Sequence, residues 1–234
     1  MKTAIIPARG GSKRIPRKNI RLFNGKPMLV WSVEAALHSG VFDRVIVSTD
    51  DTAIAEVARQ AGAEVPFLRP AALADDYTGT GAVICHAIEW LRQQQQAPSL
   101  VGCIYATAPL LLPADLQQAA AALNADPALK FVFSGCRFSF PIQRALYRNA
   151  QGQVTPVQPD AIPQRSQDLP ETFHDAGQFY LGAADAWLSG AAMFAPHSYL
   201  QELPQHRVQD IDTEADWLRA ELLQTLLLQA PGPR

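Results

Sequence analysis

A segment near the N-terminus combines basic residues with glycine: residues 7–19 read PARGGSKRIPRKN. The two glycines allow main-chain N–H groups to approach an anion closely, and Arg9 and Lys18 can donate charge-assisted hydrogen bonds to phosphate oxygens. A short apolar run precedes the segment, which indicates a buried strand that opens into a loop. In an open α/β sheet such a loop borders the crevice where ligands bind. We therefore predict that this basic loop holds a polyphosphate.

Two other interpretations of the basic loop stay open on charge alone: a solvated surface loop and a nucleic-acid patch. Neither common glycine-rich signature is present, since the loop contains no G-x-x-x-x-G-K-[ST] and no G-x-G-x-x-G. The formal net charge of −2, however, argues against a protein that coats nucleic acid. The position of the loop directly after a strand favours a small anionic ligand.

Two carboxylates near the C-terminus, Asp210 and Asp212, are separated by one residue. In an extended segment, side chains at this spacing project to the same face, so both can reach one ion. Mg²⁺ prefers oxygen ligands of this kind, with substrate phosphates completing its coordination sphere. The alternative is that Asp212 caps the helix that follows it, which requires no metal. Asp-x-Asp alone is a weak motif, so the choice of a magnesium site rests chiefly on the resemblance described below.

Strand-like and helix-like segments alternate through the first 135 residues. Short apolar runs predict strands at residues 3–8, 44–48, 64–68, 100–105 and 130–134. Helical patterns with cap or stop signals lie between them, at residues 28–39, 52–60, 81–96 and 114–125. This alternation predicts an α/β fold with a doubly wound, mostly parallel sheet that is covered on both faces.

The pattern changes after residue 135. Residues 138–170 hold five of the eighteen prolines and little periodicity, yet are too apolar for a plain linker. They predict an excursion that packs against another surface. A strand at 178–181, a short helix at 183–189 and a final helix at 214–229 are expected to follow. We therefore expect one domain, residues 1–234, with 138–170 as an excursion.

Composition limits the class of protein further. No stretch approaches the roughly eighteen apolar residues that span a bilayer. The first residues lack the apolar core of a signal peptide, and the three cysteines are an odd number and widely spaced. These features predict a soluble, cytoplasmic protein without membrane contact, whose cysteines are reduced packing residues.

The basic loop resembles the N-terminal signature of the cytidylyltransferases that activate eight- and nine-carbon acidic sugars, the CMP-sialic acid synthetase family. Further features occur in the order which that family shows: Ser-Thr-Asp at 48–50, Leu-Arg-Pro at 68–70, Thr-Gly-Thr at 78–80 and Asp-Ile-Asp at 210–212. Residues 140–145 and 174–180 look like segments of the pseudaminic acid cytidylyltransferase branch. Residues 105–111 lack the Gln and Arg that sialic acid enzymes usually carry there, which disfavours N-acetylneuraminate as the substrate.

The resemblance implies a Mg²⁺-dependent transfer of CMP from CTP to an acidic nine-carbon sugar, with release of pyrophosphate. It implies a homodimer in which the excursion completes the neighbour's sugar site. Arg9, Lys18 and Asp212 would act in catalysis, and the metal would be held by Asp210 and Asp212. The nucleotide site would comprise Ala8, Arg9, Gly10, Gly11, Ser12, Lys18, Asn19, Arg69, Thr78 and Thr80.

The sugar needs donors for a carboxylate and for several hydroxyl or amide groups, and Arg suits a bidentate grip on the carboxylate. The irregular half of the chain supplies these donors, and the expected residues are Gln143, Arg144, Arg165, His174, Asp175, Gln178 and Tyr180. No general base is singled out, because Asp210 and a metal-bound hydroxide are both candidates.

Two rival functions and two rival substrates stay open. An oxidoreductase would use the same crevice for a dinucleotide. Such an enzyme requires the compact G-x-G-x-x-G turn, which is absent, and an acidic residue at the end of the second strand, for which only Asp50 is a candidate. A non-catalytic nucleotide-binding regulator would keep the basic loop without needing paired carboxylates. Within the transferase class, the alternatives to pseudaminic acid are N-acetylneuraminate and legionaminate.

Overall fold

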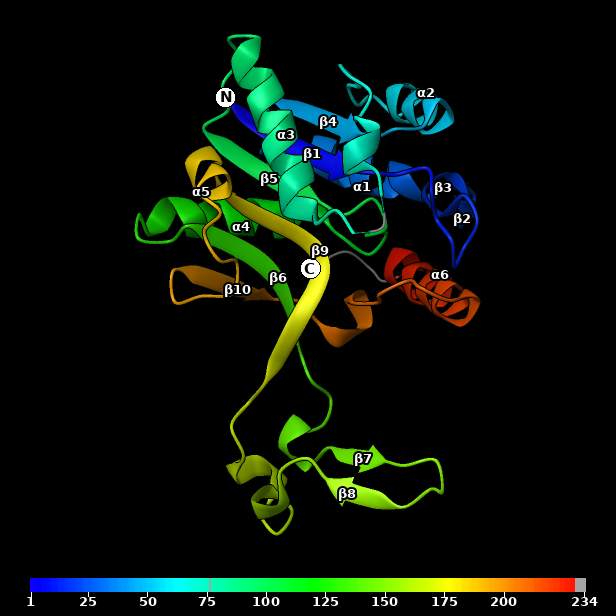
Figure 1. The fold of residues 1–234 in the computed structure, drawn as a ribbon, viewed down its shortest axis with the longest axis vertical. Helices are drawn as coiled ribbons and strands as arrows, with labels where there is room; N and C mark the ends of the chain where they lie inside the picture. The colour runs from blue at the N-terminus through cyan, green and yellow to red at the C-terminus, as the bar shows by residue number, and fades with distance from the viewer. Residues whose placement is uncertain (76, 230–234) are drawn as a thin grey trace.

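The computed structural model describes residues 1–75 and 77–229, and a six-stranded sheet forms its centre (Figure 1). The strands are β1 (Lys2–Pro7), β4 (Arg44–Ser48), β5 (Leu100–Ile104), β6 (Phe131–Arg137), β9 (Phe173–Ala183) and β10 (Ser198–Glu202). They lie in the order β10-β6-β9-β5-β1-β4. Only β9 runs antiparallel to its neighbours in this sheet. The predicted mostly parallel α/β sheet is confirmed.

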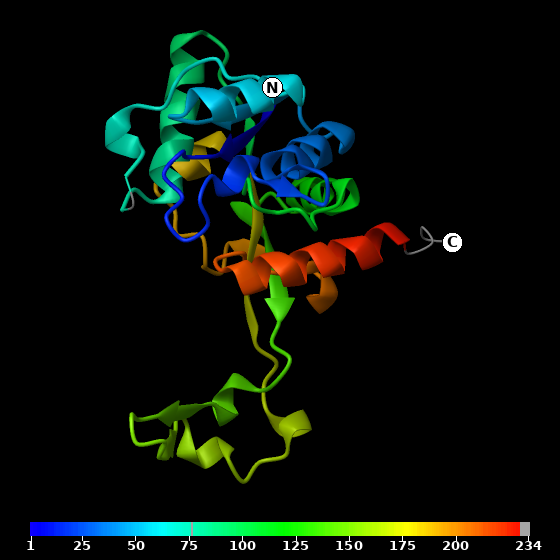
Figure 2. The same ribbon diagram turned by 90° about the vertical axis from the view of Figure 1, so that its right-hand side faces the viewer.

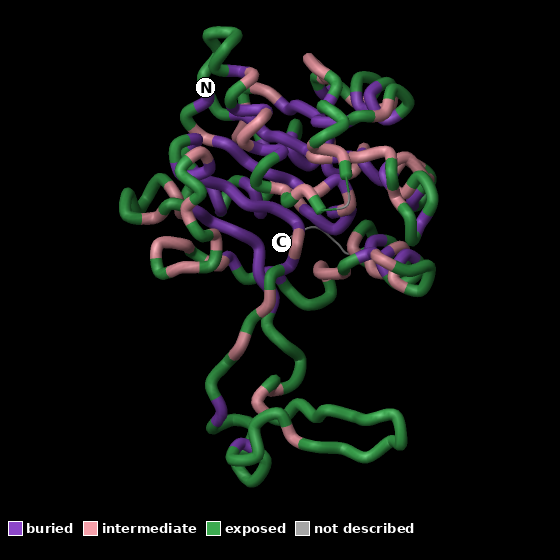
Figure 3. The backbone as a smooth tube through the Cα atoms, in the orientation of Figure 1, coloured by how far each residue is buried: buried purple, intermediate pink, exposed green. Residues whose placement is uncertain are grey.

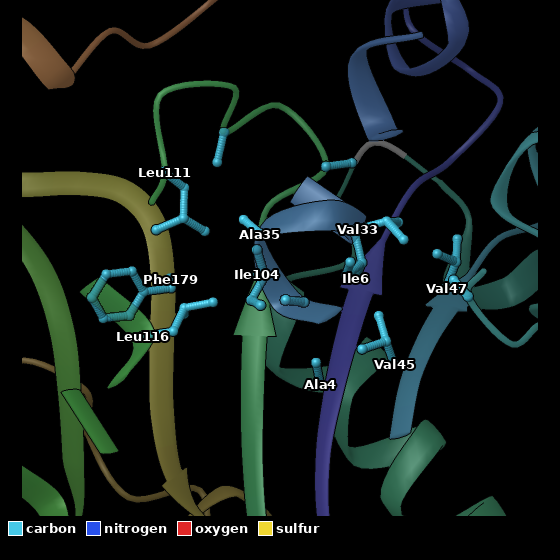
Figure 4. Close-up of a cluster of buried hydrophobic side chains, with 14 of the residues drawn as sticks. Ala4, Ile6, Val33, Ala35, Val45, Val47, Ile104, Leu111, Leu116 and Phe179 are labelled. Atoms are coloured by element: carbon cyan, nitrogen blue, oxygen red, sulfur yellow. The ribbon is translucent and has the colours of Figure 1, made fainter. Parts of the chain in front are cut away.

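Helices cover both faces of this sheet because strand residues alternate between the two sides. One face packs against α1 (Met28–His38), α2 (Thr52–Gln60) and α4 (Pro113–Ala125), and the other against α3 (Thr80–Gln93) and α5 (Ala184–Leu188). In β1, Ala4 and Ile6 face the α1 side and Ile5 faces α3. Figure 4 shows the cluster of buried side chains on the face covered by α1, α2 and α4, in which Ile6 of β1 and Val33 of α1 lie close to each other.

Capping residues define several helix ends as the sequence predicts. The Asp51 carboxylate accepts hydrogen bonds from the backbone N–H groups of Ala53 and Ile54, at 2.8 and 3.0 Å, and so begins α2. Gly40 follows α1 with a φ of 63°, a conformation that suits glycine. Pro27 lies at the N-cap of α1, directly before its first residue.

The predicted excursion, 138–170, falls in an arm, residues 138–172, that leaves the sheet from the end of β6 and returns at the start of β9 (Figures 1 and 2). It contains the hairpin of β7 (Leu146–Arg148) and β8 (Val154–Pro156), which the sequence did not indicate, together with short 3₁₀ turns. Figure 3 shows that most of the arm is exposed, whereas the sheet is buried.

The final helix α6 (Glu214–Gln229) docks on a small hairpin made of β2 (Leu22–Phe23) and β3 (Lys26–Pro27), which directly follows the basic loop. Trp217 packs edge-on against Phe23, with ring centroids 5.3 Å apart, and the Arg21 guanidinium lies over the Trp217 ring. The helix thus brings the segment before it, residues 208–213, to the basic loop. We call these residues the acidic segment, because they include Asp210 and Asp212. No helix in the described part of the chain is long and apolar enough to cross a membrane.

One expected strand is absent, one is longer than expected, and one strand was not predicted. Residues 64–68 form no strand: Glu64 makes an isolated bridge with Ile46, and Pro66 lacks the N–H that a ladder needs. The strand expected at 178–181 extends over the whole of β9, and β10 was missed. In α6, the regularly spaced leucines are exposed, and the buried face is formed by other side chains; the exposed ones are Leu218, Leu222 and Leu226.

Candidate active site

A cavity of about 280 Å³ lies at the carboxyl ends of β1 and β5, beneath the basic loop and the start of α3. Such an edge is the usual ligand site of an open α/β sheet. The predicted nucleotide residues that line it are Arg9, Ser12, Lys18, Asn19, Arg69, Thr78 and Thr80. Ala8, Gly10 and Gly11 are not among its lining residues, and Ala8 is buried in the core. The structure therefore brings most of the predicted nucleotide site together.

Hydrogen bonds hold the basic loop against two neighbouring loops. The Arg9 guanidinium donates to the backbone oxygen of Asp75 at 2.8 Å, and the Asn19 amide donates to the backbone oxygen of Arg9 at 2.9 Å. The Gly10 N–H donates to the Asp50 carboxylate at 3.0 Å. A Cβ on Gly10 would lie 2.8 Å from the Asp51 carboxylate, so this close approach requires glycine.

Lys18 joins the basic loop to the acidic segment near the C-terminus. Its Nζ donates to the backbone oxygen of Ile211 at 2.6 Å and lies 3.6 Å from the Asp212 carboxylate. Arg14, on the rim of the cavity, pairs with the same carboxylate at 2.6 Å. Residues almost two hundred positions apart in the chain therefore form one charged cluster beside the cavity.

The Asp212 side chain does not cap α6. That role falls to Thr213 and Asp216: the Thr213 N–H donates to the Asp216 carboxylate at 2.9 Å, and the Asp216 N–H donates to the Thr213 hydroxyl at 3.2 Å. The Asp212 carboxylate instead faces Arg14 and Lys18. The capping alternative is wrong, and this carboxylate is available at the site.

The two aspartates supply hard oxygen donors, but few of them. Within residues 1–75 and 77–229 no group of three or more His, Cys, Asp or Glu side chains could hold a metal ion. Asp210 is exposed and Asp212 is partly exposed. A Mg²⁺ ion fits such a donor set when phosphate oxygens of a ligand and water complete its sphere. The magnesium site stays a prediction.

The opposite wall of the cavity combines a buried guanidinium with hydroxyl groups. Arg69 is 6% exposed, and its Nε donates to the Ser48 hydroxyl at 3.2 Å. Burial lowers the pKa of Arg69. The Thr80 and Tyr105 hydroxyls lie 3.3 Å apart, and the Thr78 hydroxyl donates to the Asp75 carboxylate at 2.7 Å. Neither threonine acts as a simple helix cap through its side chain.

Several polar residues around the cavity were not predicted as site residues. Asp75, Tyr105 and Thr107 line it, and Asp50 binds the Gly10 N–H. Asp75 and Tyr105 lie beside predicted motifs in space but outside them in sequence. Asp50, which belongs to the Ser-Thr-Asp motif, and Thr107, which lies in the segment 105–111 compared with the sialic acid enzymes, had signals that could have found them.

A second cavity, of about 600 Å³, shares Thr80 and Tyr105 with the first. Its walls are largely apolar and include Phe131, Trp187, Met193 and Phe194. Two of the predicted sugar residues, Asp175 and Tyr180, also line this cavity. The Tyr180 hydroxyl donates to the Asp175 carboxylate in a short hydrogen bond.

Burial raises the pKa of Tyr180, and the neighbouring Tyr105 hydroxyl and the Asp175 carboxylate raise it further. Burial also raises the pKa of Tyr105. Both phenols therefore keep their protons at neutral pH. Tyr180 donates to Asp175, and the Tyr105 hydroxyl lies at the boundary that the two cavities share.

The other predicted sugar residues lie elsewhere. Gln143, Arg144 and Arg165 are on the arm. There Arg144 donates to the Ser166 hydroxyl, and Arg165 donates to the Asp168 carboxylate. His174 packs edge-on against Phe138 at the base of the arm, and Gln178 is buried with its amide donating to the backbone oxygen of Arg207. Within one chain, the structure brings only Asp175 and Tyr180 of the seven to a cavity beside the nucleotide residues.

All three cysteines are free, as predicted: Cys103 and Cys136 are buried, and Cys85 is partly buried at the second cavity. Burial raises the pKa of Cys103, so its thiol stays protonated. These residues therefore contribute packing.

Comparisons with known proteins agree with this geometry. A family model described as cytidylyltransferase matches residues 3–215. Over 94% of both chains, the sequence is 49% identical to a pseudaminic acid cytidylyltransferase of Campylobacter jejuni. It is 32% identical to the N-acylneuraminate cytidylyltransferase A of Danio rerio over 94% of this chain and half of that protein.

The fold is also similar to a solved one. CMP:2-keto-3-deoxy-manno-octonic acid synthetase, in a structure complexed with CTP, aligns with a TM-score of 0.71 and 19% identity over 97% of this chain and all of that chain. The resemblance of the chain to the CMP-sialic acid synthetase family is confirmed by the family model and the sequence relatives. The chain belongs to the cytidylyltransferase family.

Proposed function

We propose that this protein transfers CMP from CTP to pseudaminic acid, giving the CMP-sugar and pyrophosphate. The observation that carries the proposal is the nearly full-length similarity to a pseudaminic acid cytidylyltransferase, combined with a cavity whose predicted nucleotide residues converge. The alternatives within the same chemistry are N-acetylneuraminate and legionaminate. The family membership argues against the oxidoreductase and gives no support to the regulator.

In this proposal the triphosphate lies along the basic loop, with Arg9 and Lys18 as its principal cations. They would neutralise the triphosphate and stabilise charge that develops on the α-phosphate and on the leaving pyrophosphate. Phosphoryl transfer of this type depends chiefly on positioning and electrostatics, so the chain needs no nucleophile of its own. Arg69, Thr78 and Thr80 would bind the cytidine at the other end of the cavity.

Asp210 and Asp212 would hold Mg²⁺ together with phosphate oxygens of CTP. When bound, the metal would neutralise phosphate charge and help to fix the in-line geometry. The placement of Asp212 beside Lys18 and Arg14 supports this assignment, because the carboxylate lies where the loop cations gather. Those cations can exchange Asp212 for phosphate oxygens when the nucleotide enters.

The second cavity would receive the sugar. It opens beside Thr80 and Tyr105, so a sugar held there lies next to the nucleotide. Its apolar walls suit the methyl groups of N-acyl substituents, and Asp175 and Tyr180 offer polar partners for hydroxyl or amide groups. The carboxylate of the sugar needs a cation that this cavity does not include among its lining residues.

A second copy of the chain would supply that cation. The arm carries Arg144 and Arg165 together with apolar side chains that one chain leaves exposed, among them Phe140 at 82% and Tyr147 at 67%. We propose a homodimer in which the arm of one copy packs against the other and completes its sugar site. The apolar area on the arm supports the proposal, because monomeric proteins rarely expose contiguous apolar surface of this kind.

The proposed function is tested by incubating the protein with pseudaminic acid, Mg²⁺ and either CTP, UTP or ATP, and by following pyrophosphate release and the mass of the product. The proposal expects a CMP-sugar from CTP alone and no turnover after chelation of the metal. Turnover with UTP or ATP at a comparable rate would overturn the assignment of CTP as the nucleotide. Turnover in the presence of the chelator would overturn the requirement for Mg²⁺.

A further inference from the structure

A buried ion pair lies behind the acidic segment. The Arg207 guanidinium donates two hydrogen bonds to the Asp115 carboxylate, at 2.6 and 2.9 Å, and the two side chains are only 12% and 5% exposed. The backbone oxygens of both partners are also bound, that of Asp115 by the Gln201 amide and that of Arg207 by the Gln178 amide. Neither partner lines the nucleotide cavity or the second cavity.

The pair joins two elements that are far apart in sequence. Asp115 lies in the first turn of α4, where its carboxylate also accepts the N–H of Leu112 at 2.9 Å. Arg207 ends the 3₁₀ turn that leads into the acidic segment, three residues before Asp210. A bidentate pair between buried groups fixes both distance and angle, and breaking one side leaves an unpaired charge in the interior. The start of the acidic segment is therefore tied to the core of the sheet.

The rest of the segment is anchored on both sides of its carboxylates. Val208 packs against the small cluster of Cys136, Ala176 and Leu203. Between the two aspartates, Ile211 is 1% exposed and belongs to the cluster that α6 shares with the β2–β3 hairpin. Beyond them, Thr213 begins α6 through its exchange with Asp216. Asp210 and Asp212 themselves remain at least partly exposed.

We propose that Arg207, Asp115 and Gln178 are positioning residues that hold residues 207–213, and hence Asp210 and Asp212, in the arrangement that binds the metal with CTP. The inference rests on the proposed function for its catalytic meaning. It also corrects the role expected for Gln178, which acts on the Arg207 backbone rather than on the sugar. Groups that orient metal ligands from behind typically affect metal affinity or activity about 10- to 100-fold.

The test compares the wild-type protein with the double variant Arg207→Met/Asp115→Asn. This change removes the ion pair without leaving a buried charge, and the Asn oxygen can still accept the Leu112 N–H. The matched control is Arg44→Met/Glu64→Gln, which removes another bidentate pair, Arg44 with Glu64, at the opposite edge of the sheet. Gln178→Leu is a milder second variant, because it keeps the ion pair and removes only the bond to the Arg207 backbone.

Two readouts separate positioning from mere stability. The first is amide hydrogen exchange of residues 207–213 in protein without metal or nucleotide, where we expect at least about tenfold faster exchange in the double variant and unchanged exchange in the control. The second is the Mg²⁺ concentration for half-maximal rate, which should rise about tenfold while the KM for CTP at saturating Mg²⁺ changes less than about twofold. Gln178→Leu should shift both readouts in the same direction by a smaller factor.

Unchanged exchange of residues 207–213 in a folded double variant would overturn the inference, as would exchange that accelerates equally along the whole chain with an unchanged Mg²⁺ requirement. If the double variant does not fold, Gln178→Leu decides by the same criteria. The exchange experiment needs no turnover, so failure of the wild-type protein to make a CMP-sugar would refute the proposed function while leaving the anchoring of the segment separately decided.

Discussion

Lys18 touches both halves of the proposed site, since it lines the cavity and binds the acidic segment. We expect Lys18→Met to lower kcat/KM for CTP roughly 10- to 100-fold, the value of one hydrogen bond to a charged group. Steady-state kinetics with pyrophosphate detection measures this. Lys130→Met is the matched control, because Lys130 is exposed directly before β6, at the amino ends of the parallel strands and away from the cavity, and it should change kcat/KM less than about twofold.

Phe194 tests the assignment of the second cavity to the sugar. It lines that cavity, is 65% exposed and packs edge-on against Phe133 with ring centroids 5.1 Å apart. Phe194→Ala should raise the KM for the sugar about tenfold through lost apolar contact, with the KM for CTP unchanged. Tyr199→Ala, a half-exposed aromatic on β10, provides the control. An equal rise in both KM values, or in neither, would contradict the assignment.

Site residues inside continuous motifs could be predicted from the sequence because their chemistry is local. Arg9 and Lys18 belong to one loop, Arg69 lies in the short Leu-Arg-Pro motif, and Thr80 lies in a motif that begins α3. Tyr105 and Asp75 could not be predicted, because each reaches the cavity only through the packing of separate loops.

Among the elements, α2 offers a test of capping and its pH dependence. Burial alone would raise the pKa of Asp51, but the N–H groups of Ile54 and Ala53 and the Arg17 guanidinium outweigh it, so the pKa is lowered. The stabilisation is present above the unfolded pKa of about 4 and is lost as the pH falls through the lower folded value. Asp51→Ala should therefore cost about 1 kcal/mol of unfolding free energy at pH 7, and the difference should shrink as the pH falls below about 4.

Denaturant unfolding at several pH values measures this difference. Glu56→Gln, an exposed change on the same helix, is the control and should leave the unfolding free energy nearly unchanged. A cost for Asp51→Ala that does not depend on pH would mean that the lost packing, and not the charged cap, stabilises α2.

Elements with their own start and stop signals were predictable, and those fixed by neighbours were not. The bounds of β4, α2 and α6 agree with the sequence because apolar runs, caps and helical spacing are local signals. β10 is an edge strand whose pairing partner, β6, lies more than sixty residues earlier. The outward leucines of α6 had no local signal either, since helical spacing defines a face without saying which side the fold buries.

For the molecule as a whole, the arm predicts association of two copies. Phe140→Glu should raise the dissociation constant of the dimer at least about tenfold without lowering the thermal stability of the core, because the side chain is 82% exposed in one chain. Light scattering and analytical ultracentrifugation measure the fractions of monomer and dimer. Leu226→Glu, at a 65% exposed leucine of α6, is the matched control and should leave association unchanged. A wild-type monomer at micromolar concentration would contradict the dimer.

The overall plan of the molecule follows from the sequence more readily than its second cavity does. The break in periodicity after residue 135 predicts the excursion, and the strand–helix alternation before it predicts the sheet. The second cavity combines residues from α3, β6, β9 and α5 with Tyr105, which directly follows β5, and with the turn after α5. No single stretch of sequence encodes such a surface, because it exists only after the sheet has formed.

The most direct test of the central claim is the rate of pyrophosphate release with CTP and Mg²⁺ on pseudaminic, N-acetylneuraminic and legionaminic acids and Kdo, each run in parallel with Asp212→Asn. We predict turnover of pseudaminic acid and loss of this activity in the variant. The kcat/KM for N-acetylneuraminic acid, legionaminic acid and 2-keto-3-deoxy-manno-octonic acid (Kdo) should be lower by at least roughly 100-fold. Preferred turnover of another acid, or no turnover of any acid by a protein that still binds CTP, would contradict the account.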